Sequence, residues 1–64
     1  MSKLKEARAA KGITQKQLAV ASSVSLGSLQ KYESGERDIN KAEALTVYKI
    51  AQALSTTVEK LLNL

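Results

Sequence analysis

The sequence predicts an all-α fold, a compact bundle of five short helices in which the second and third are joined by a tight turn. Apolar residues recur at intervals of three and four, and capping residues and glycines divide that pattern into short segments. No stretch alternates as a β-strand does. With 64 residues, the chain is expected to form one small domain, residues 1–64, without a deep pocket.

The first helix is predicted over residues 2–11. Leu4 and Ala7 lie at helical spacing on its apolar side. Gly12 follows as a residue that readily adopts the left-handed conformation that closes a helix.

The second helix is predicted to begin at a capping box, the letters TQKQ. The hydroxyl of Thr14 can accept a hydrogen bond from the amide three residues on, while the side chain of Gln17 reaches back. Leu18 and Ala21 are the residues expected to face inward.

An interruption follows at residues 21–25, where the letters ASSVS are poor helix formers. Serine side chains here compete with the helix for backbone hydrogen bonds, and Ser25 can cap a new helix. The third helix is therefore predicted over residues 25–34, with Leu29 and Tyr32 on its inward side.

Gly35 is expected to end the third helix, and the letters GERDIN to form a polar loop whose last residue, Asn40, caps the fourth. The fourth helix is predicted over residues 41–54, and a short last helix opens at Thr56 or Thr57. The apolar residues of these two helices are Leu45, Val47, Tyr48, Ile50, Ala51, Leu54, Val58, Leu61 and Leu62.

Composition argues against several classes of function. The chain has no cysteine and no histidine, which removes disulfides, thiolate and imidazole metal ligands and the commonest general base. Neither an enzymatic activity nor a cofactor is therefore expected. No apolar run approaches the roughly 18 residues of a membrane span, so we expect a soluble cytoplasmic protein with no membrane partner.

The net charge of +4 comes entirely from the first part of the chain. Residues 1–37 carry seven Lys or Arg against three Glu, whereas three basic and three acidic residues balance over residues 38–64. Such a surface suits a polyanion, but a solvated basic face that keeps a small protein soluble has the same composition.

Taken in order, these elements resemble the phage-repressor and Cro-like helix-turn-helix domains, the XRE family, which share the lambda-repressor-like fold. The matching stretches are LKEARAAKGITQKQLA, the dipeptide VS at residues 24–25, KYESGER and KIAQALSTTVEKLL. They span almost the whole chain and are specific as a set. The resemblance implies a DNA-binding transcriptional regulator, cytoplasmic and nucleoid-associated, of bacterial or phage origin. It would insert its third helix into the major groove of double-stranded DNA.

The resemblance also assigns residues to the phosphate backbone. Gln15 matches a glutamine that meets a phosphate at the start of the second helix, with Thr14 and Lys16 beside it. Arg37 matches a basic position in the following loop, and Lys41 would extend that contact. Ordinary solvated side chains remain the alternative for Gln15 and Lys16.

Five residues of the third helix would lie near base edges: Ser25, Leu26, Gly27, Ser28 and Lys31. At the positions of Leu26 and Gly27, members of the family usually have polar residues. Neither Leu26 nor Gly27 can make a bidentate hydrogen bond to a base. Leu26 can only pack on a thymine methyl, and Gly27 lets the helix approach closely. We therefore expect modest selectivity that rests mainly on Lys31.

Other matches are structural. Arg8 and Glu33 correspond to a partly buried ion pair that orients the third helix. Ser23 and Ser55 stand where the family generally has glycine with positive φ, at a cost of about 1 kcal/mol each. The segment before Ile50 is about three residues longer than usual, which predicts an extra turn at the start of the fourth helix.

Two functions of different classes remain open. The first is a DNA-binding regulator, acting as a homodimer or as a module of a larger assembly. The second is a protein-interaction module, an antitoxin or adaptor, that uses the surface at Leu26 and Gly27 as an apolar contact. Steep salt dependence of duplex binding would distinguish the first from the second.

Overall fold

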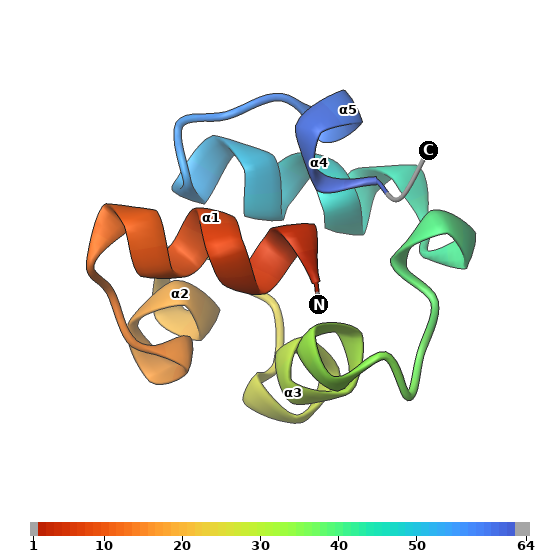
Figure 1. The fold of residues 1–64 in the computed structure, drawn as a ribbon, viewed down its shortest axis with the longest axis horizontal. Coiled ribbons are helices and arrows are strands. Elements are labelled where there is room, and N and C mark those ends of the chain that lie inside the picture. The colour runs from red at the N-terminus through yellow and green to blue at the C-terminus, as the bar shows by residue number, and fades with distance from the viewer. Residues whose placement is uncertain (1, 63–64) are drawn as a thin grey trace.

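The computed structural model describes residues 2–62, and all regular structure within that range is helical, as predicted (Figure 1). The elements are α1 (Lys3–Lys11), α2 (Gln15–Ser22), α3 (Leu26–Ser34), the 3₁₀ helix η1 (Ile39–Lys41), α4 (Ala44–Ala53) and α5 (Val58–Leu61). In Figure 1, α2 and α3 lie along one side of the molecule and α4 and α5 along the other. None of these helices is long and apolar enough to span a membrane.

Local capping explains where the first three helices begin and end. The hydroxyl of Ser2 caps α1, and Thr14 forms both bonds of the predicted capping box at the start of α2. Ser25 caps α3 by accepting a hydrogen bond from a backbone amide at 3.2 Å. Gly12 and Gly35 close α1 and α3 at φ values of 75° and 85°. These boundaries follow from local sequence alone.

The serine-rich interruption is the turn between α2 and α3. The buried hydroxyl of Ser22 donates to the carbonyl of Leu18 at 2.7 Å and accepts from the amide of Val24 at 3.3 Å. Ser23 takes up the left-handed conformation at φ 59°, and Ser55 does the same at φ 54° after α4. Both serines, which stand where the family generally has glycine, therefore adopt the backbone conformation that the resemblance implied.

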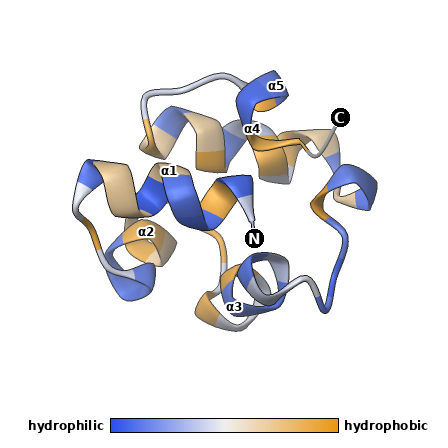
Figure 2. Ribbon diagram, viewed as in Figure 1, coloured by the Kyte–Doolittle hydropathy of each residue, from blue (hydrophilic) through white to orange (hydrophobic). Residues whose placement is uncertain are grey.

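One apolar core joins all the elements. It includes η1 as well as the α-helices, and Figure 2 shows the hydrophobic segments alternating with hydrophilic ones along the ribbon. The buried apolar residues are Leu4, Leu18, Leu29, Tyr32, Ile39, Val47, Ile50, Ala51, Leu54 and Leu61. The predictions that Leu29, Tyr32 and Leu61 face inward are confirmed.

The region between α3 and α4 differs from the prediction. Ile39 is only 3% exposed, so the supposed polar loop folds inward and forms η1. Asp38 caps that turn by accepting from the amide of Asn40 at 2.9 Å. Asn40 is therefore not the cap of the fourth helix, which begins at Ala44 after Glu43 and not at residue 41. The extra length predicted before Ile50 therefore forms a separate turn, η1, and does not extend the fourth helix.

Three predicted helix-face residues lie on the surface. Ala21 is exposed because α2 directs Leu18 and Ser22 inward, and Ser22 is held there by its bonds in the turn. Leu45 and Tyr48 are 59% and 53% exposed on the outer side of α4.

Candidate nucleic-acid interface

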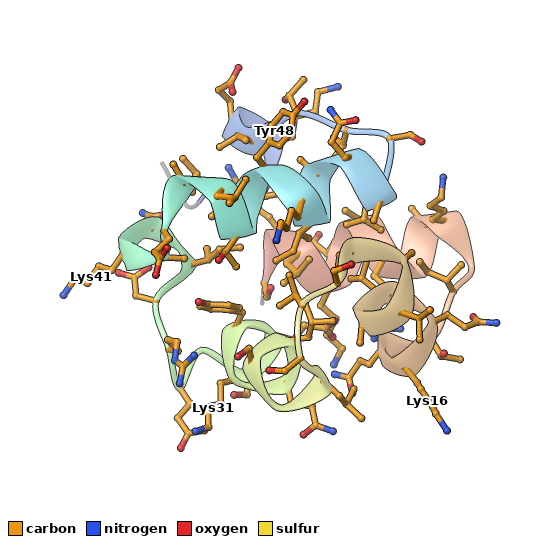
Figure 3. All side chains as sticks on the ribbon, turned by 180° about the vertical axis from the view of Figure 1, so that it is seen from behind. Lys16, Lys31, Lys41 and Tyr48 are labelled. Atoms are coloured by element: carbon orange, nitrogen blue, oxygen red, sulfur yellow. The ribbon has the colours of Figure 1, made fainter. Side chains whose placement is uncertain are left out.

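The exposed face of α3 is the centre of the candidate interface. Leu29, Tyr32 and Glu33 are buried, so the residues on the opposite side of this helix face solvent. This face consists of Gly27, Gln30, Lys31 and Ser34, all exposed. In Figure 3, Lys31 and Lys16 lie at one edge of the molecule, and Tyr48 lies at the opposite edge.

The two serines predicted to read bases bond to each other. Ser25 donates its hydroxyl hydrogen to the hydroxyl oxygen of Ser28 at 2.9 Å, while also capping the helix. Arg37 donates from Nη1 to the same oxygen of Ser28 at 3.4 Å. Their hydroxyl groups are therefore partly occupied within the protein.

Arg37 is folded back onto α3. Its guanidinium carbon lies 5.6 Å from the centre of the Tyr32 ring, a distance suited to a cation–π contact. Its backbone amide donates to the carbonyl of Lys31 at 3.1 Å. The loop therefore holds this cation against the flank of α3 that carries Ser28 and Tyr32, beside its outward face.

A hydrogen-bonded cluster joins α1, α2 and α3 beneath the interface. Arg8 donates from Nε and Nη2 to the two carboxylate oxygens of Glu33, at 2.7 and 3.0 Å, and from Nη1 to the carbonyl of Ile13 at 2.8 Å. The Glu33 side chain is only 3% exposed. Its hydrogen bond raises the pKa of Arg8 above the already high value of a guanidinium. The predicted ion pair is present.

Gln15 is part of the same cluster. Its Nε2 donates to Oε1 of Glu33 at 3.2 Å, which fixes the amide at the first residue of α2. An amide nitrogen has two hydrogens, so one remains for an anion. Thr14, in contrast, uses its hydroxyl in the capping box.

The two remaining predicted cations lie apart. Lys16 is exposed on the first turn of α2, and in Figure 3 it extends from the same edge as Lys31. Lys41 ends η1 and extends from a different edge, away from Lys16. The structure thus brings Gln15, Lys16 and α3 to one side of the molecule but does not bring Lys41 to them.

One exposed residue of this face was not among the predicted contacts. Gln30 lies three residues after Gly27, and Lys31 lies four after it, and these are the spacings of a shared helix face. That spacing was readable from the sequence. Leu26, which was predicted to lie in the groove, is only 37% exposed.

Comparison with known protein families identifies this fold and its chemistry as those of a described family. The sequence profile described as helix-turn-helix matches residues 4–61, a range that contains every residue of the candidate interface. No curated protein and no solved structure matches the chain significantly.

Proposed function

The chain belongs to the helix-turn-helix family of DNA-binding domains, and we propose that it regulates transcription by inserting α3 into the major groove of double-stranded DNA. One observation carries this proposal. The outward face of α3 is polar, and it stands beside an anchored amide, Gln15, and a free-standing cation, Lys16, at the start of α2.

The contacts proposed for the phosphate backbone follow from that arrangement. Gln15 offers its second amide hydrogen, and the first amides of α2 carry the partial positive charge of a helix N-terminus. Lys16 adds a full charge. The loop after α3 supplies Arg37 on the other side, and the more distant Lys41 is left as an outer contact. These groups would position α3 without reading sequence.

Salt dependence tests this proposal directly. The affinity for a mixed-sequence duplex, followed by fluorescence anisotropy, should fall with salt by about 0.9 log units per log unit for each phosphate contacted. Lys16→Ala should reduce that slope by about 1. Lys49→Ala removes an exposed lysine from α4, next to Tyr48, and should leave the slope unchanged. Absence of binding at low salt, or equal effects of both variants, would contradict the proposal.

We further propose that the regulator acts in the cytoplasm, at the nucleoid, as a homodimer or within a larger assembly. A single short recognition helix seldom supplies enough affinity, and helix-turn-helix dimers bind half-sites about one helical turn apart. A duplex carrying two half-sites at that spacing should therefore take up two copies.

A protein-interaction module is the second candidate, and one observation favours it. Leu45 and Tyr48, three residues apart on α4, are large apolar residues exposed by 59% and 53%. Tyr48 lies at the edge opposite Lys16 and Lys31 in Figure 3, so this surface is separate from the edge at which α3 presents Lys31. Tyr48→Ser should leave duplex affinity unchanged under the DNA-binding proposal. A regulator that needs this surface for a protein partner would lose its cellular activity in the same variant.

A further inference from the structure

We propose that Gln30 is the principal sequence-reading residue of α3 and that it contacts adenine across the open space in front of Gly27. This inference rests on the proposed entry of α3 into the major groove. It names a specificity-determining residue that lies outside the set predicted from the sequence.

The other residues predicted to contact bases have fewer hydrogen-bonding groups available. Ser25 and Ser28 bond to each other at 2.9 Å, and Ser28 also accepts from Arg37. Leu26 has no polar group in its side chain, and Gly27 has no side chain. Neither can distinguish bases by hydrogen bonding.

Gln30 has the opposite properties. It is exposed and lies on the outward face of α3, between the positions of Gly27 and Lys31. In the part of the chain that the structure describes, its side-chain amide makes no hydrogen bond to the protein. Its donor and its acceptor are therefore both available to a ligand.

Gly27 gives Gln30 room to reach a base. Side chains on a helix lean toward its N-terminus, so Gln30 can extend toward the turn that contains Gly27, three positions earlier. A Cβ added to Gly27 would meet no atom within 4 Å, so nothing inside the protein requires glycine here. Glycine is also a poor helix former. The open space is explained if a base edge occupies it.

The chemistry of the amide selects adenine. Its nitrogen donates to N7 and its oxygen accepts from the N6 amino group, a bidentate pair that no other base offers in the major groove. Lys31, on the same face, carries donors only and would suit guanine. Gln30, which can both donate and accept, therefore reads a base that Lys31 cannot pair with in this way.

Selection of binding sites from a randomised duplex library tests the inference. Wild type should show a strong preference for adenine at one position. Gln30→Ala should lower the discrimination at that position by roughly five- to 150-fold, while binding to mismatched sites changes little. Gln52→Ala removes a matched exposed glutamine from α4 and should leave the selected site unchanged. Circular dichroism would check that both variants are folded.

A second variant tests the role of the open space. Gly27→Leu should fold at least as stably as wild type, because leucine is the better helix former and its Cβ would meet no atom within 4 Å, yet lose the adenine preference with Gln30 intact. An unchanged site preference in Gln30→Ala, or in Gly27→Leu, would overturn the inference while leaving DNA binding in place. If wild type failed to bind any duplex at low salt, the proposed function itself would fall, and the role of Gln30 with it.

Discussion

Glu33 accepts hydrogen bonds from two helices at once, from Arg8 of α1 and from Gln15 of α2, while itself belonging to α3. Its carboxylate is nearly inaccessible to solvent, so these hydrogen bonds take the place of bonds to water. A residue of this kind determines how α3 is oriented relative to the start of α2. Both parts of the proposed interface therefore depend on one buried side chain.

Removing that carboxylate should be costly. Glu33→Ala leaves the guanidinium of Arg8, whose side chain is only 16% exposed, without its carboxylate partner, and such losses destabilise proteins by about 3–5 kcal/mol. Glu36→Ala removes an exposed glutamate two residues beyond α3 and should change stability by less than about 0.5 kcal/mol. Urea unfolding of both variants measures the difference. Equal midpoints would contradict a structural role for Glu33.

Replacing Ser23 with glycine should stabilise the protein. Ser23 holds a φ of 59°, which costs a non-glycine residue about 1–2 kcal/mol, and part of that is recovered when glycine replaces it. Ser23→Gly should therefore raise the free energy of unfolding by about 0.5–1 kcal/mol, seen as a higher melting temperature. Ser34→Gly, at a helical position of α3, should lower it. A Ser23→Gly variant less stable than wild type would refute this account of the turn.

At the scale of elements, the start of α2 is the most informative. Thr14 makes both bonds of the capping box, at 2.8 and 3.0 Å, and positions the first turn that carries Gln15 and Lys16. Thr14→Ala should cost about 1 kcal/mol of stability and also weaken duplex binding. Thr57 occupies the equivalent position before α5 but makes no side-chain capping bond.

Thr57→Ala is therefore the matched control for Thr14→Ala. Its loss of stability should be much smaller, and its duplex affinity should equal that of wild type. Chemical unfolding and anisotropy on the two variants provide the comparison. A loss as large in Thr57→Ala would mean that capping at Thr14 contributes nothing special.

The elements also differ in how far the sequence predicts them. The ends of α1, α2 and α3 are determined by residues next to them, Ser2, Thr14, Ser25 and two glycines, so local patterns were sufficient. η1 was missed because its position depends on the burial of Ile39 in a core formed by distant segments. No local signal in GERDIN distinguishes that isoleucine from one in a loop.

The candidate site shows the same division. The Arg8 and Glu33 pair followed from the family resemblance, but the third member, Gln15, joins through a hydrogen bond that depends on three helices packing together. Likewise Ser25 and Ser28 are less available to contact bases because they hydrogen-bond to each other. Only the side-chain positions reveal this bond. Gln30 was readable from helical spacing.

At the scale of the whole molecule, the proposed functions lie on different sides. Lys16 and Lys31 mark one edge, and Tyr48 marks the edge opposite (Figure 3). The excess of positive charge comes from residues 1–37, which include α1, α2 and α3, whereas α4 and α5 lie in the balanced part of the chain. A duplex held at the first edge would leave the apolar residues of α4 free.

The most direct test of this arrangement is a titration with mixed-sequence duplex DNA at two salt concentrations, followed by backbone amide chemical shifts. We predict changes concentrated at Gln15 and Lys16, along α3 and at Arg37, larger at the lower salt concentration. Residues around Tyr48 should not move. Amide shifts centred on α4, or no shifts at all in dilute buffer, would contradict the claim that α3 is the DNA-binding element.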